Sequence, residues 1–207
     1  MAIITAITPQ KNAQRVNIYL DGKFYCGLEK ITCASSGLQI GTAVSESQLQ
    51  QIQLQSEQSV AFNKAIKQIS QRMRSQKELE QYLAQKGFLD SVISATIQKL
   101  KEYSYLNDSE FAAELVRSYP NLGPRAIAQK LLQKGISQNI INNVLSGQDS
   151  AQQEQKATEI AKKYLKTKNN SKNIQQKLNN YIISKGFSYE IASKITRELT
   201  QGEDYDY

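Results

Sequence analysis

The sequence predicts a mainly α protein of tandem three-helix repeats that form an elongated curved array, with a small β-rich N-terminal unit. The repeats are marked by a lysine, a glycine and an apolar residue after three amphipathic segments: Lys86-Gly87-Phe88, Lys134-Gly135-Ile136 and Lys185-Gly186-Phe187. The glycines stand 48 residues apart (87 to 135) and 51 residues apart (135 to 186). Self-similarity at such a period is typical of helical repeat proteins, in which neighbouring units share a core.

Residues 1–44 make up the expected β-rich unit. The segment 16–20 alternates in polarity, Asp21-Gly22 is a strong hairpin-turn signal, and residues 23–28 return as a second strand. Residues 3–7, ended by Pro9, are a candidate third strand, and about three strands are needed for an independent sheet. We expect this unit to serve as a scaffold or as a cap for the first repeat.

Residues 45–59 predict an amphipathic linker helix, which Ser45 or Ser47 caps. From residue 60 the apolar spacing is helical throughout, and it predicts repeats over 60–105, 106–149 and 150–200, followed by an acidic tail over 201–207. The first helix of the first repeat carries a stripe that we expect to be buried, formed by Phe62, Ile66, Ile69 and Met73.

The middle helix of each repeat has a pair of apolar residues four positions apart, followed after four more positions by the marker glycine. The pairs are Leu79 and Leu83, Ile127 and Leu131, and Leu178 and Ile182. Glycine in this place suits a left-handed helix C-cap, and the next apolar residue folds back onto the last turn. Similar signals bound the other helices: Ser75 and either Asn107 or Asp108 as N-caps, Pro120 as a stop and Pro124 as a first residue.

The net charge of +7 is concentrated in the repeats. Residues 1–60 are balanced, with four basic and four acidic side chains, whereas residues 61–150 have twelve basic and eight acidic side chains and residues 151–200 have ten and four. An electrostatic partner should therefore contact the repeats. No apolar run is long enough to cross a bilayer and no secretory signal is present, so we expect a cytoplasmic protein without membrane contact.

The composition argues against an enzyme or a metal protein. The chain contains no histidine, and its two cysteines, Cys26 and Cys33, form a poor metal site without further soft ligands. We predict that both are reduced, structural residues in a strand region. Neither a nucleophile–base pair nor a glycine-rich phosphate loop is recognisable, so we expect no catalytic residue, no metal and no cofactor.

Two runs of basic residues without an intervening acid are candidate contacts for a polyanion. The candidates in the first run are Lys64, Lys67, Arg72, Arg74 and Lys77, those in the second are Lys162, Lys163, Lys166 and Lys172, and Arg125 lies between the runs. A surface with charges of one sign repels itself, so a polyanionic partner is expected, although a solvated face is the alternative for any single lysine. Arg72 and Arg74 either bind a carboxylate or phosphate or form a tie to Glu78 or Glu80.

Several motifs together carry a resemblance to a known family. They are Arg72-Met-Arg74-Ser75, Glu78-Leu79, Leu83, Lys86-Gly87-Phe88, Tyr105-Leu-Asn-Asp108, Phe111-Ala112, Gly123, Ile127, Leu131 and Lys134-Gly135-Ile136. The chain thereby resembles, over roughly residues 1–200, the RecX family of bacterial recombination regulators, and residues 16–22 resemble the extra β region of some members. It departs from the family pattern at Ser104, where glycine is usual, and at Asn179-Asn180-Tyr181, where an arginine-rich stretch is expected.

The resemblance implies a function that periodicity alone does not reveal. Members of this family bind the RecA recombinase, lie along the groove of its filament on DNA and dampen its strand-exchange, ATPase and co-protease activities. By this resemblance, the expected partners are the RecA filament and single- or double-stranded DNA contacted non-specifically through phosphates, and we expect the chain to act as a monomer.

A DNA-binding module of the helix-turn-helix kind is the alternative. It requires basic or amide residues at the start of each third helix, where bases would be read. Two of these starts contain an acid, Asp90 and Glu190, which argues against groove reading there. The motif Tyr105-Leu-Asn-Asp108 has a structural interpretation, in which Leu106 packs at the turn and Asn107 or Asp108 caps the next helix.

Overall fold

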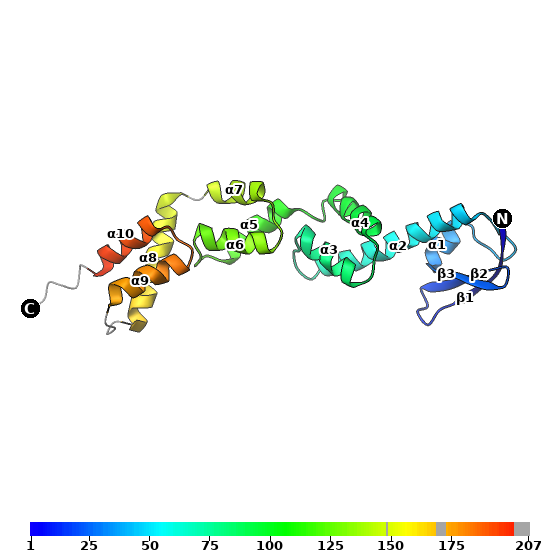
Figure 1. Cartoon of the computed structure of the whole chain (residues 1–207), viewed down its shortest axis with the longest axis horizontal. Helices are drawn as coiled ribbons and strands as arrows, with labels where there is room; N and C mark the ends of the chain where they lie inside the picture. Colours follow the sequence, from blue (N-terminus) through cyan, green and yellow to red (C-terminus); the bar gives the residue numbers. More distant parts are fainter. Residues whose placement is uncertain (148, 169–172, 201–207) are drawn as a thin grey trace, which may run out of the picture. The chain divides into compact units, whose positions relative to one another are not determined.

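The computed structural model describes residues 1–147, 149–168 and 173–200. Ten helices and four strands occur in these residues, which confirms the mainly α class with a β-rich N-terminal unit (Figure 1). The chain forms two compact units, Met1–Leu106 and Asn107–Tyr207.

The N-terminal sheet contains the predicted hairpin and third strand. Its strands are β1 (Ala2–Pro9), β2 (Arg15–Leu20), β3 (Lys23–Glu29) and β4 (Ala43–Val44), all antiparallel to their neighbours in the order β3-β2-β1-β4. At the β2–β3 turn, Asp21 and Gly22 have φ values of 46° and 82°. Positive φ at both central residues is what a type I′ turn requires, and this turn matches the twist of the strands.

A short helix that the sequence did not predict, α1 (Lys30–Ser35), follows the sheet. Cys33 lies in α1 and not in a strand, which corrects the predicted environment of this cysteine, whereas Cys26 does lie in β3. Six residues are fewer than two helical turns, so they show no readable period. The helix covers the sheet, and Cys33 joins the buried core of Ile4, Ile18 and Leu28.

The separate linker helix expected over residues 45–59 is not present, because α2 is one continuous helix, Glu46–Ile69. Ser45 caps it through a reciprocal capping box with Gln48. The first half of α2 packs on the sheet, where Leu49 is 1% exposed, and the buried Ser56 hydroxyl accepts a hydrogen bond from the Glu29 N–H at 2.8 Å. The second half is the first helix of repeat 1, so one helix belongs to two cores.

The buried face of this second half also differs from the predicted stripe. Ala61 and Ala65 are completely buried, Phe62 and its neighbours are only half-buried, and Met73 is 41% exposed. Small alanines allow the α2 backbone to approach α4 (Asp90–Glu102) closely, and the larger side chains then pack around this contact.

Three-helix packing is repeated as predicted. Repeat 1 is completed by α3 (Gln76–Gln85) and α4; repeat 2 contains α5 (Asp108–Ser118), α6 (Pro124–Gln133) and α7 (Gln138–Ser146); repeat 3 contains α8 (Ser150–Lys168), α9 (Ile174–Ser184) and α10 (Tyr189–Thr200). Each apolar pair of a middle helix is at most 1% exposed. Each repeat has its own hydrophobic core around that pair.

The marker glycines are left-handed C-caps, with φ values of 82°, 80° and 92° at Gly87, Gly135 and Gly186. In repeat 1 the Phe88 N–H donates to the Leu83 carbonyl at 3.3 Å, and the Gly87 N–H donates to the Ala84 carbonyl at 2.9 Å. These two bonds define a Schellman motif. The equivalent pair recurs in repeat 2, so the same sequence signal produces the same backbone turn.

The cap of α9 also joins repeat 3 to repeat 2. The Gly123 N–H donates to the Lys185 carbonyl at 2.8 Å, and the Arg125 N–H donates to the Gly186 carbonyl at 3.1 Å. Gly123 has no side chain to cap α6, so the carbonyls at the end of α9 satisfy N–H groups that an N-terminal turn leaves unpaired. The positive end of α6 thereby meets the negative end of α9.

Replacing Gly186 with alanine should destabilise the protein more than replacing Gly87 does. Both residues have positive φ, which costs alanine about 1–2 kcal/mol. A Cβ at Gly87 meets nothing within 4 Å, whereas a Cβ at Gly186 would overlap the backbone nitrogen of Ala126. Urea unfolding should therefore show an additional loss of about 1–3 kcal/mol for Gly186→Ala. Equal losses in the two variants would contradict the close contact between repeats.

Candidate partner interface

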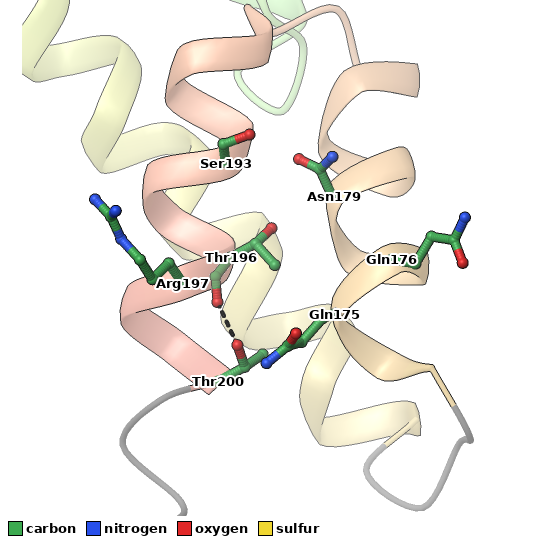
Figure 2. Close-up of a pocket in the computed structure, with 7 residues that line it drawn as sticks. All are labelled: Gln175, Gln176, Asn179, Ser193, Thr196, Arg197 and Thr200. Carbon is green, nitrogen blue, oxygen red and sulfur yellow. Dashed lines mark hydrogen bonds between the residues drawn. The ribbon is translucent and has the colours of Figure 1, made fainter.

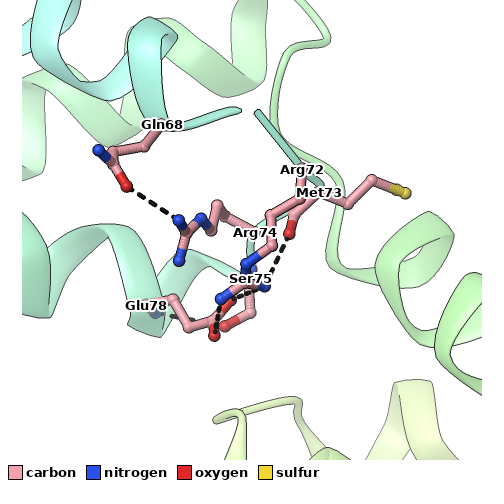
Figure 3. Close-up of polar contacts among 6 residues, drawn as sticks. All are labelled: Gln68, Arg72, Met73, Arg74, Ser75 and Glu78. Carbon is pink, nitrogen blue, oxygen red and sulfur yellow. Dashed lines mark hydrogen bonds and ion pairs between the residues drawn. The ribbon is translucent and has the colours of Figure 1, made fainter. Parts of the chain in front are cut away.

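The junction between α2 and α3 holds both candidate arginines (Figure 3). Ser75, which is completely buried, precedes α3, and its Oγ accepts a hydrogen bond from the Glu78 N–H at 3.2 Å. In return, the Glu78 carboxylate accepts one from the Ser75 N–H at 3.3 Å. This capping box satisfies two helix-terminal donors and fixes the course of the preceding loop.

Arg72 is tied to the same carboxylate. Its Nη2 lies 3.0 Å from Glu78 Oε1 and its Nη1 lies 3.4 Å from Oε2, and Nη1 also donates to the Met73 carbonyl at 3.1 Å. Of the two ties considered from the sequence, the structure has the one to Glu78, while Glu80 accepts from Gln76. The Arg72 side chain is 50% exposed, so we assign the ion pair at most about 1 kcal/mol.

Arg74 is in a different state from Arg72. It is half-buried and donates through Nη2 to Gln68 Oε1 at 2.9 Å, but its buried Nε has no acceptor (Figure 3). Together with Glu78 and Tyr82 it lines a pocket of about 200 Å³. A buried donor without an acceptor is costly, and a guanidinium binds carboxylate or phosphate through parallel bonds. Arg74 therefore has one guanidinium nitrogen without a partner among the described residues, whereas both terminal nitrogens of Arg72 are paired.

The candidate lysines of repeat 1 are exposed. Lys64 and Lys67 lie on α2 and Lys77 lies in the first turn of α3. None of the three forms an ion pair with a residue that the structure describes. No acid among the described residues balances their charges, so binding of a polyanion at these lysines would release counterions.

The remaining candidates lie in the second unit. Arg125 is exposed in the first turn of α6, and Lys162, Lys163 and Lys166 are exposed on α8. These four also lack an ion-pair partner within the described part of the chain. Lys172 lies outside the described residues.

The sequence did not predict that the lysines before the marker glycines pack on tyrosine rings. Lys86 Nζ lies 5.5 Å from the centre of the Tyr82 ring, and Lys185 Nζ lies 5.2 Å from that of Tyr181. In both repeats the tyrosine precedes the lysine by four residues, a spacing that places both on one helix face. These lysines therefore contribute to packing within their own repeat. The four-residue spacing between tyrosine and lysine is the sequence feature from which this contact could have been predicted.

The starts of the third helices are acidic in two of the three repeats. Asp90 lies in the first turn of α4 and Glu190 lies in the first turn of α10, and both are exposed. A negative charge at the tip of a recognition helix would face the phosphates that flank a groove. This geometry disfavours the helix-turn-helix alternative at these positions.

The two cysteines are buried and unpaired. Burial raises the pKa of the Cys26 thiol to about 11, and a thiol with so high a pKa is a poor nucleophile. No cluster of three or more potential metal ligands occurs in the described residues, nor does any helix there have the length and apolarity to cross a membrane.

Comparison with known proteins matches most of the chain to one family. Residues 2–45 match the RecX N-terminal domain, residues 61–100 its first three-helix domain and residues 107–145 its second. The regulatory protein RecX of Bacillus licheniformis is 35% identical over 99% of this chain and 80% of its own length, and that of Clostridioides difficile is 34% identical over the whole of both chains.

Solved structures agree with these matches. A crystal structure of a regulatory protein RecX is 27% identical, with a TM-score of 0.73 over 98% of this chain and 100% of that chain. The crystal structure of RecX from Lactobacillus salivarius is 30% identical, with a TM-score of 0.65 over 70% of this chain and 97% of that one.

Raising the pH from 8 to 10.5 should destabilise the protein through Cys26. The pKa of the Cys26 thiol is about 11 in the folded protein and 9.0 in the unfolded chain. Above pH 9 the unfolded chain therefore loses this proton first, and the equilibrium shifts toward unfolding. The loss should be on the order of 1–2 kcal/mol in urea unfolding. Between the two pH values, a Cys26→Ala variant should lose less free energy of unfolding than the unchanged protein. An identical loss in both proteins would contradict the raised pKa of Cys26.

Proposed function

We propose that this chain, which belongs to the RecX family of regulatory proteins, regulates the RecA recombinase by binding along the groove of the RecA filament on DNA. The effect we propose is inhibition of the ATPase and strand-exchange activities of the recombinase. The chain acts by occupying the filament as a monomer, without chemistry of its own.

The observation that carries this proposal is the set of exposed, unpaired cations in repeats 1 and 3. Lys64 and Lys67 in one repeat, and Lys162 and Lys163 in the other, lack acidic partners among the described residues. A protein–DNA filament offers both phosphates and carboxylates to such side chains. Arg74, with its unsatisfied Nε, is the side chain that we propose contacts an acidic group of the partner.

Direct action on DNA is the second candidate function. The same unpaired lysines favour non-specific phosphate contacts, and these contacts weaken steeply with salt. The acids at the starts of α4 and α10 oppose specific groove reading. The two functions therefore differ in whether the regulatory effect depends on affinity for bare DNA.

The DNA-dependent ATPase of the recombinase, measured with and without this protein over a series of salt concentrations, distinguishes the two functions. Binding to the same DNA without recombinase is measured in parallel. We expect inhibition to persist at salt concentrations that abolish binding to bare DNA. Inhibition that disappears together with DNA binding would support direct action on DNA, and no inhibition at any salt concentration would refute the proposed function.

Two single substitutions refine the same assay. Arg74→Gln should weaken inhibition at least several-fold, whereas Arg72→Gln should weaken it less and mainly lower stability, by at most about 1 kcal/mol, because Arg72 is tied to Glu78. The two substitutions each remove one positive charge, at positions two residues apart, so a difference between them is not an effect of net charge. Equal inhibition by both variants and the unchanged protein would exclude the arginines as contacts.

A further inference from the structure

A polar pocket of about 290 Å³ lies between α9 and α10 of repeat 3 (Figure 2). The side chains that line it carry amides and hydroxyls almost exclusively: Gln175, Gln176, Asn179, Ser193, Thr196 and Thr200, with Arg197 as the one charged residue. A pocket of this composition, in a helix pair otherwise packed through Leu178 and Ile195, is not explained by the hydrophobic core.

Two polar atoms of this pocket, Thr196 Oγ1 and Asn179 Oδ1, are buried and have no hydrogen-bond partner among the residues that the structure describes. Thr196 is only 7% exposed. Both side chains are directed into the space between the helices in Figure 2. Leaving such groups unpaired destabilises the folded state, so native proteins rarely do so without a reason.

The chemistry of the two atoms is complementary to a carboxamide. The Thr200 hydroxyl donates to the Thr196 carbonyl at 2.7 Å, so its proton is used, whereas the proton of the Thr196 hydroxyl is available. Asn179 Oδ1 can only accept. The two unpaired atoms thus supply one donor and one acceptor, the pair that an amide group satisfies with its own oxygen and N–H.

A carboxylate satisfies this pair less well, because its oxygens would face the lone pairs of Asn179 Oδ1. Arg197, the only cation among the described residues that line the pocket, extends its guanidinium away from both unpaired oxygens in Figure 2. The inner part of the pocket is therefore neutral, and it disfavours a DNA phosphate for the same reason.

We propose that this pocket binds the side-chain carboxamide of an asparagine or glutamine residue on a partner protein. The Thr196 hydroxyl donates to the carboxamide oxygen, and Asn179 Oδ1 accepts from the amide N–H. Identification of that partner as the recombinase rests on the proposed function, whereas the preference for a carboxamide does not. The pocket would add a neutral, specific contact in repeat 3 to the unpaired lysines of α8.

The carboxamide preference is tested on the full chain with two matched probes, N-acetylglutamine N′-methylamide and N-acetylglutamate N′-methylamide. Side-chain NMR signals of Asn179 and Thr196 are followed as each probe is added. We expect the shifts to saturate with the glutamine probe, at a dissociation constant at least tenfold lower than that of the glutamate probe. Equal or tighter binding of glutamate, or no shift at these residues with either probe, would overturn the proposal.

A Thr196→Val substitution removes the hydroxyl and keeps the shape. It should abolish binding of the glutamine probe and weaken recombinase inhibition at least threefold, while the melting temperature stays equal or rises because an unpaired group is removed. Thr158→Val on α8, whose hydroxyl donates to the Glu154 carbonyl, is the control and should keep both activities. A fall in melting temperature with unchanged probe binding would mean that Thr196 is only structural.

The two proposals fail in distinguishable ways. Binding of the glutamine probe by a protein that does not inhibit the recombinase would refute the proposed function alone. Full inhibition by Thr196→Val, despite loss of probe binding, would refute the pocket as a recombinase contact and leave the proposed function intact.

Discussion

The chain turns after the middle helix of each repeat at a glycine with positive φ, and the packing of the repeat depends on that turn. The turn directs the residue after the glycine back toward the core; Phe187, for example, is completely buried. It also fixes the carbonyls at the helix end. In repeat 3 these carbonyls at Lys185 and Gly186 accept N–H groups from the start of α6, so the turn that ends one helix also caps another.

Local signals were sufficient to predict most of the fold. The hairpin at Asp21-Gly22, the caps at Ser75 and Asn107, and the buried pairs of the middle helices are confirmed, because each depends on residues within one or two helical turns. The continuity of α2 was not predictable in this way. The exposed, glutamine-rich face of α2 concealed the fact that Leu49 and Ala61 belong to different cores.

In the candidate site, too, features set by neighbouring residues could be predicted from the sequence, whereas features set by tertiary packing could not. The basic runs were visible in the sequence, and one alternative for Arg72, a tie to Glu78, is realised. The sequence could not separate Arg72 from Arg74, because the difference is the unsatisfied Nε of a half-buried side chain. The pocket between α9 and α10 was equally hidden, although Asn179 belongs to the stretch that departs from the family pattern.

The distribution of charge and polarity over the repeats is consistent with contact to a composite partner of protein and nucleic acid. In the complex that we propose, exposed lysines would provide long-range, salt-sensitive attraction, while Arg74 and the pocket between α9 and α10 would provide short-range contacts to particular groups. A regulator of a filament benefits from both, because attraction to DNA alone would not distinguish a coated strand from a bare one.

The central claim is that the chain recognises the recombinase filament and not only its DNA. The most direct test is the equilibrium affinity of this protein for a single strand coated with recombinase, compared with the same bare strand, at about physiological ionic strength, where exposed charges are screened beyond roughly 8 Å. We predict at least tenfold tighter binding to the coated strand. Equal affinity for the two, or tighter binding to the bare strand, would contradict the claim.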